Sequence, residues 1–232
     1  SDTAEIYHSL TSSVPTPHNT VLKSGDSATL TRVWLGRQGD DHVGLDGNLT
    51  VESTASLSTT AEFIISQESS LTSSGAISVG NGDGLRVTDS GTVTLKSGST
   101  LNKMTLRENS TATLESGSTL NTLILQGNSI ATLEVGSTVD TIVNPAQYSQ
   151  LTLNSTYSSN LTVRESSTLT LNGTLDGNLA VQQTASLTVN GTLNGDINNT
   201  STSMLTIGAG GTLNGLLEVN SNEQVTVAGN VN

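Results

Sequence analysis

Cysteine is absent from this 232-residue sequence, and aromatic residues make up only 2% of it. Without cysteine there is no disulfide bond, no thiolate metal site and no cysteine nucleophile. The scarcity of aromatic residues means that any core must consist mainly of Leu, Val, Ile and Ala. No apolar run approaches the roughly 20 residues of a membrane-spanning helix, so we expect no direct membrane insertion of this segment.

Basic residues are also scarce, because 8 Lys and Arg stand against 20 Asp and Glu, for a formal net charge of -12. The attraction to phosphate that gives most non-specific nucleic-acid affinity is therefore missing, and we expect no nucleic-acid partner. The three histidines, His8, His18 and His42, all precede the regular part of the chain, and no Gly-x-Ser-x-Gly motif is present. We expect no enzyme activity, no cofactor and no metal site.

The second half of the sequence repeats an apolar-Thr-apolar triplet at spacings of 19, 19, 20, 18, 18, 18 and 20 residues between the central threonines. The central threonines are Thr94, Thr113, Thr132, Thr152, Thr170, Thr188, Thr206 and Thr226. Alternation of apolar and polar residues predicts a strand with the aliphatic side chains inward and the threonine outward. A period near 19 residues is typical of a solenoid.

Two further strand-like segments recur inside each period. One is a Thr-Leu-Asn type triplet after a glycine-containing turn, as in Thr100-Leu101-Asn102, and the other is an apolar triplet such as Met104-Thr105-Leu106. Three strands in each period describe one triangular coil, which must stack on its neighbours to bury its apolar face. The sequence therefore predicts an all-β, right-handed three-sided parallel β-helix of about ten coils of 18–22 residues.

The first half of the sequence is less regular. Asn48-Leu49-Thr50-Val51 resembles Asn160-Leu161-Thr162-Val163, which places it in a third strand, and residues 1–27 show no period. We expect residues 1–27 to form an N-terminal cap region and residues 28–232 to form the β-helix. Val225-Thr226-Val227 still follows the repeat, and a solenoid ending there would expose a strand edge, so we expect the native protein to continue beyond this segment.

The turns Ser97-Gly98-Ser99-Thr100-Leu101-Asn102 and Ser116-Gly117-Ser118-Thr119-Leu120-Asn121, together with the 19-residue period, resemble the passenger domains of AIDA-type self-associating autotransporter adhesins. The resemblance covers about residues 48 to 232. It implies a bacterial cell-surface location and an anchoring outer-membrane β-barrel outside this segment. It also implies a role in cell aggregation, biofilm formation or host attachment, with the same protein on neighbouring cells as the partner. A host matrix protein or a glycan is an alternative partner.

Two rows of polar residues are candidates for self-association or adhesion. The first contains Thr94, Thr113, Thr132 and Thr152, and the second contains Asn102, Asn121, Asp140, Asp176, Asn194 and Asn214. Structural explanations exist for both rows, because threonine stabilises exposed strands and Asn or Asp suits tight turns. The functional interpretation is a hydrogen-bonding face for another copy of the protein or, less favoured, for ice or a glycan.

Two acidic or glycine-rich segments outside the rows have plainer interpretations. Asp40-Asp41-His42, with Asp46 nearby, is interpreted as a solvated loop instead of a metal or acid-base site, and Gly80–Gly84 as a plain loop. A passive stalk that presents another domain is the main alternative to an adhesin. A polysaccharide-degrading β-helix enzyme is less favoured, because Glu115 and Glu134 repeat at one position without basic partners.

Overall fold

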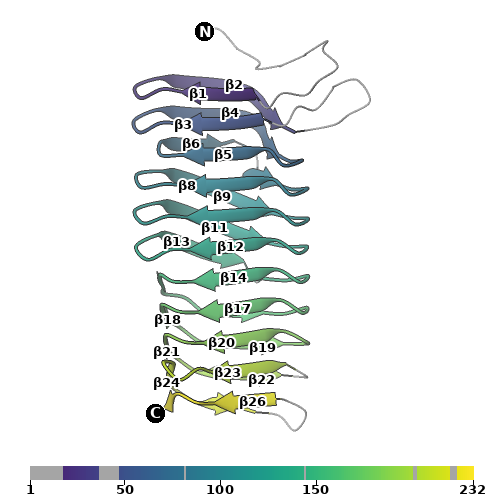
Figure 1. Cartoon of the computed structure of the whole chain (residues 1–232), viewed down its shortest axis with the longest axis vertical. Coiled ribbons are helices and arrows are strands. Elements are labelled where there is room, and N and C mark those ends of the chain that lie inside the picture. Colours follow the sequence, from purple (N-terminus) through teal and green to yellow (C-terminus); the bar gives the residue numbers. More distant parts are fainter. Residues whose placement is uncertain (1–17, 37–46, 81, 144, 201–202, 220–223) are drawn as a thin grey trace.

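The computed structural model describes residues 18–36, 47–80, 82–143, 145–200, 203–219 and 224–232. These residues form strands that stack into one elongated rod (Figure 1). Strands of successive coils pair in parallel, so the predicted parallel β-helix is confirmed. Among the described residues, no helix is long and apolar enough to cross a membrane.

One sheet runs the whole length of the rod and contains 11 strands, which at about 4.8 Å per strand corresponds to about 50 Å. In order, its strands are β1 His18–Leu22, β3 Gly47–Val51, β5 Ser70–Ser73, β8 Thr92–Leu95, β10 Thr111–Leu114, β12 Ile130–Leu133, β14 Gln150–Leu153, β17 Thr168–Leu171, β20 Ser186–Val189, β23 Met204–Ile207 and β26 Gln224–Val227. We refer to it as the 11-stranded sheet.

The remaining strands form three shorter sheets. The 7-stranded sheet contains β2 Ser27–Leu35, β4 Ser56–Ile65, β6 Ala76–Val79, β7 Leu85–Val87, β9 Thr100–Leu106, β11 Thr119–Leu125 and β13 Thr138–Val143. The 5-stranded sheet contains β15 Thr156–Tyr157, β18 Thr174–Asp176, β21 Thr192–Asn194, β24 Thr212–Asn214 and β27 Asn230–Val231. The 4-stranded sheet contains β16 Leu161–Val163, β19 Leu179–Gln182, β22 Ile197–Thr200 and β25 Leu217–Glu218.

The coil changes its shape midway along the rod. In the first half, the second and third segments of the repeat form one long strand, such as β9, except in the coil where β6 and β7 are separate. In the second half these segments form two strands, such as β18 and β19. Two residues, Asn102 and Lys103, separate the inward-facing Leu101 and Met104, but three residues, 176–178, separate the corresponding leucines of β18 and β19. The additional residue converts a bend within one strand into a corner between two sheets.

The turn after the 11-stranded sheet changes in the opposite direction. Four residues, 96–99, join β8 to β9, whereas two residues, Asn172 and Gly173, join β17 to β18. The coil loses two residues at this turn and gains one at the new corner, so the period falls from 19 to 18 residues. The spacings of 19 and 18 residues in the sequence therefore correspond to two coil geometries.

The core is one continuous column of aliphatic side chains from Leu30 to Leu213. In a representative coil, Leu114, Leu120, Leu123 and Leu125 have no exposed surface. Burying such a side chain contributes about 2 kcal/mol, and each leucine is covered from above and below by the equivalent residues of adjacent coils. Stability therefore depends on contacts between coils.

Two details at the N-terminal side correct the sequence interpretation. β1 pairs with β3, so the solenoid includes His18–Leu22 and begins before residue 28; residues 1–17 lie outside the described residues. Thr50 pairs with Val21 on one side and Thr72 on the other. It therefore belongs to the 11-stranded sheet and not to a third strand. The sequence did not distinguish the two, because both kinds of strand show the same alternation of inward and outward residues.

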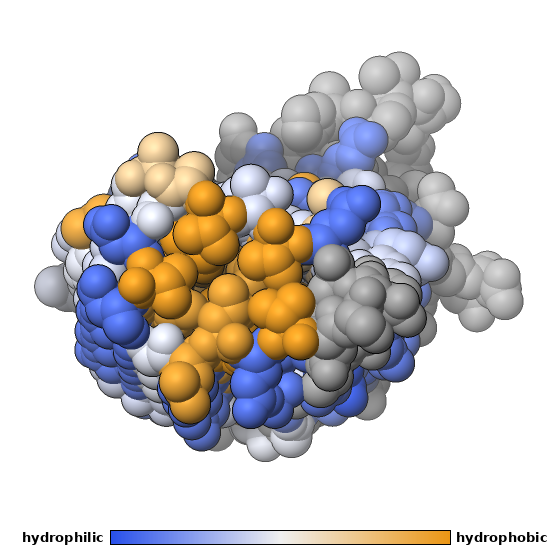
Figure 2. Space-filling model, turned by 90° about the horizontal axis from the view of Figure 1, so that it is seen from below, coloured by the Kyte–Doolittle hydropathy of each residue, from blue (hydrophilic) through white to orange (hydrophobic). Residues whose placement is uncertain are grey.

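At the C-terminal end, the cross-section of the core is exposed (Figure 2). Val219 is 50% exposed, Val227 49% and Val231 45%. These residues belong to the last described strands and turns of the rod. The result is an apolar patch at one end of the rod.

Candidate functional site

The threonine row is longer than the sequence indicated. Backbone pairing places ten threonines in register along the 11-stranded sheet. Thr72, which lies 22 residues before Thr94 in the sequence, belongs to the row, and Thr50 extends it by one more coil. The members are Thr50, Thr72, Thr94, Thr113, Thr132, Thr152, Thr170, Thr188, Thr206 and Thr226. The predicted row on one outer face is confirmed, whereas its role in adhesion stays a prediction.

Local alternation explains why these hydroxyls face outward. Ala112 and Leu114 are fully buried on either side of the half-buried Thr113. Among the residues that the structure describes, the hydroxyls of Thr94, Thr113 and Thr132 have no hydrogen-bond partner within the chain. Each hydroxyl donates one hydrogen bond and accepts up to two, so the row presents unused donors and acceptors at regular spacing.

A second outward row lies two residues before each threonine. Its members are Asn48, Ser70, Thr92, Thr111, Ile130, Gln150, Thr168, Ser186, Met204 and Gln224. No outward side chain of the described strands β3 to β26 in this sheet is charged. By contrast, the 7-stranded sheet carries Glu62, Arg86, Lys103 and Asp140. The outer face of the 11-stranded sheet is thus an uncharged surface on a strongly acidic chain.

The second candidate row lies on other sheets. Asn102, Asn121 and Asp140 belong to the 7-stranded sheet, and the other three residues belong to the 5-stranded sheet. All six side chains are exposed. The two candidate rows therefore lie on different faces of the rod.

Most of this second row is hydrogen-bonded within the chain. The Asn194 amide donates to the Asp176 carboxylate at 2.7 Å, and the Asn214 amide donates to Asn194 at 2.8 Å. Asn232 continues the ladder to Asn214 at 2.8 Å. Asn102 instead donates to the Val79 carbonyl and accepts from the Val79 N–H. These bonds join adjacent coils, which is a structural use of the row.

A further ladder was missed by sequence reasoning. Asn154 donates to the Glu134 carboxylate at 3.0 Å, Asn172 donates to Asn154 at 2.8 Å, and Asn190 donates to Asn172 at 3.0 Å. Its signal in the sequence is an asparagine two residues after the central threonine of three successive coils. This ladder borders the uncharged face along the turn that leaves the 11-stranded sheet.

Two neighbouring carboxyl groups, Asp89 and Glu108, have shifted pKa values. Partial desolvation, a hydrogen bond with Glu108 and the negative charge of Glu108 raise the pKa of Asp89. Hydrogen bonds from Thr88 and Asp89 lower the pKa of Glu108.

Among the described residues, no group of three or more His, Cys, Asp or Glu is placed to hold a metal ion. Asp40, Asp41, His42 and Asp46 lie outside the described residues.

Comparison of the chain with protein-family models, with curated proteins and with solved structures found no match.

Proposed function

We propose that this chain is the adhesive part of a bacterial cell-surface protein and that it associates with copies of itself on neighbouring cells through the outer face of the 11-stranded sheet. The observation that carries the proposal is the uncharged face with its ten threonines in register. Two chains of net charge -12 repel each other. Because this face has no charged side chains, contact between two such faces does not place like charges against each other.

The chemistry of the face suits pairing with an identical face. A threonine hydroxyl both donates and accepts hydrogen bonds, so one row complements another. Two copies of one surface pair around a twofold axis, and an axis perpendicular to the rods places them antiparallel, the arrangement required for proteins that extend from facing cells. One hydroxyl pair contributes little, about 0.5–1.5 kcal/mol, but the repeat provides many contacts along one rod.

The proposed context is an autotransporter passenger that is exposed outside the cell and anchored by an outer-membrane β-barrel, with aggregation, biofilm formation or host attachment as its outcome. Support comes from the parallel solenoid, the 18- to 19-residue repeat and the absence of cysteine, which suits a chain that crosses membranes unfolded. A host matrix protein or a glycan is an alternative partner for the same surface.

The proposal is tested by displaying the protein on a non-aggregating bacterium and measuring how fast the cells settle. A triple variant, Thr113→Glu, Thr132→Glu and Thr152→Glu, places three charges on the uncharged face and is expected to abolish clumping. These side chains are outward, so circular dichroism should still report β-structure. The matched control, Asn121→Glu, Thr122→Glu and Thr141→Glu, places the same charges on the 7-stranded sheet and is expected to leave clumping unchanged.

The other outcomes separate the alternatives. Loss of clumping in the control set alone assigns association to the row of Asn121 and Asp140. No clumping by the unmodified protein favours the passive stalk. Release of reducing sugars from polysaccharides by the purified chain favours the enzyme and contradicts the proposal that the chain acts by adhesion alone.

A further inference from the structure

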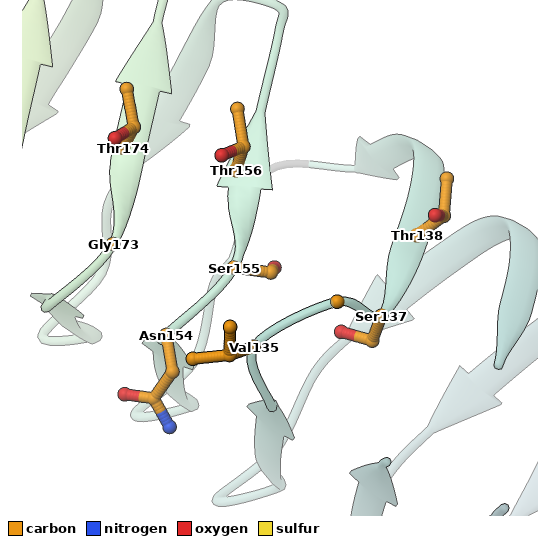
Figure 3. Close-up of a pocket in the computed structure, with 9 residues that line it drawn as sticks. Val135, Ser137, Thr138, Asn154, Ser155, Thr156, Gly173 and Thr174 are labelled. Carbon is orange, nitrogen blue, oxygen red and sulfur yellow. The ribbon is translucent and has the colours of Figure 1, made fainter. Parts of the chain in front are cut away.

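A cavity of about 340 Å³ lies where the two coil geometries meet. Four residues, Glu134 to Ser137, form the turn on one side, whereas the next coil uses two residues, Asn154 and Ser155. The longer turn extends beyond the shorter one, so a recess remains between them (Figure 3). The volume lies within the range of small-molecule sites, which is about 300–1,000 Å³.

The floor of this seam cavity contains an unsatisfied hydroxyl. Ser155 is 4% exposed, and its Oγ has no hydrogen-bond partner among the described residues. In the equivalent longer turns, the Ser118 and Ser137 hydroxyls donate to the carbonyls of Glu115 and Glu134 at 2.6 and 2.7 Å. The shorter turn removes that carbonyl acceptor. Figure 3 shows the Ser155 side chain directed toward the turn that carries Ser137.

The recess also provides the space that the Ser155 side chain occupies, since the next coils have no room for a side chain at this position. The next two coils place Gly173 and Gly191 at this turn position. A Cβ on Gly173 would lie 2.1 Å from the Ser155 carbonyl oxygen, and one on Gly191 would lie 2.0 Å from the Gly173 carbonyl oxygen. Of these three short turns, only the first, which adjoins the longer turn, carries a side chain at its second position. A buried hydroxyl without a partner is unfavourable, and a ligand that forms a hydrogen bond with it would remove this cost.

The lining of the cavity is polar and uncharged. Hydroxyls of Ser137, Thr138, Thr156 and Thr174 join Ser155, and the exposed Val135 supplies an apolar surface at the rim. The Asn154 side chain is held in place, since it donates to Glu134 and accepts from Asn172. A site of neutral donor-acceptor groups gives no charge complementarity to an ion but matches a ligand that carries several hydroxyls.

We infer that the seam cavity binds a neutral saccharide unit, with Ser155 at its floor and Thr156 and Thr138 at its sides. Ring hydroxyls would pair with these groups, and an apolar ring face would pack on Val135. The cavity is separate from the threonine row, so this inference stands or falls independently of self-association.

The test is an NMR titration of the full chain with lactose, maltose, cellobiose and diacetylchitobiose. The expected result is that at least one sugar shifts backbone signals of residues 135–138 and 154–156. Two variants should then weaken the affinity about tenfold: Ser155→Gly, which recreates the Asn-Gly turn of the next coils, and Thr156→Val, which removes one hydroxyl. The matched control Thr192→Val lies in the same row of the 5-stranded sheet, outside the cavity, and should bind normally.

Three results would overturn the inference. The first is the absence of shifts at these residues with every neutral sugar. The second is an equal loss of affinity in Thr192→Val, which would indicate general contact with the exposed threonines. The third is binding at the cavity by sialyllactose or a short peptide but by none of the neutral sugars, which would assign another ligand class.

Discussion

The phenolic oxygen of Tyr157 accepts a hydrogen bond from the backbone N–H of Ile142 at 3.0 Å. β13 is the last strand of the 7-stranded sheet, and β15, which contains Tyr157, is the first strand of the 5-stranded sheet. The two strands do not pair with each other in the sheet order. A side chain thus supplies the acceptor that a neighbouring strand would provide, and both residues are 4% exposed.

Replacement of Tyr157 by Phe should destabilise the rod at this junction. The buried N–H of Ile142 would lose its acceptor, which costs about 1–3 kcal/mol while the ring still fills the core. Urea unfolding followed by circular dichroism measures the change, and hydrogen exchange should accelerate at Ile142. Normal stability together with unchanged exchange would contradict the role assigned to this bond.

The glycines of the short turns should not tolerate a side chain. In Gly191→Ala the new Cβ would meet the Gly173 carbonyl oxygen at 2.0 Å, so adjacent coils must separate. We expect a loss of several kcal/mol, comparable to severe core substitutions. Gly82→Ala is the control, since nothing lies within 4 Å of the position that its new Cβ would occupy. Equal melting temperatures for the two variants would refute the close approach of the coils.

Self-association of the purified chain should strengthen as salt is added. Like charges repel at low ionic strength, and the Debye length shrinks from about 30 Å at 0.01 M to about 10 Å at 0.1 M. Sedimentation velocity across a sodium chloride series measures the association constant. A constant that falls with salt would indicate an interface made of ion pairs and would argue against the uncharged face.

Asp89 and Glu108 should titrate as a linked pair. The raised pKa of Asp89 contributes stability that is present at low pH and lost as pH rises through that pKa, while the lowered pKa of Glu108 acts in the opposite direction. Glu108→Gln removes one negative charge, so the pKa of Asp89 should fall. Carboxyl carbon shifts followed against pH report this directly. An unchanged titration of Asp89 would show that desolvation alone raises its pKa.

The repeat made the fold predictable. The spacing between apolar-Thr-apolar triplets gives the length of one coil, and the alternation within each triplet shows which side chains face inward. The row from Thr94 to Thr226 follows directly from the sequence. The assignment of Thr50 to a third strand was wrong, because strands of different sheets show the same alternation of inward and outward residues. The merging of two segments in β9 was not foreseen, because the difference is a single residue at the bend. The cavity at Ser155 depends on the lengths of two turns in adjacent coils, which no local pattern reveals.

The uniform register of the 11-stranded sheet has an evolutionary consequence. Excision of residues 173–190 would join Asn172 to Gly191, two positions that meet in the same turn of successive coils. Each strand next to the deletion would pair with the equivalent strand of the following coil. The rod would therefore shorten by one coil, about 4.8 Å, and keep its architecture. Duplication would lengthen it by the same step. The length of the rod is therefore a property that unequal recombination can adjust in fixed increments.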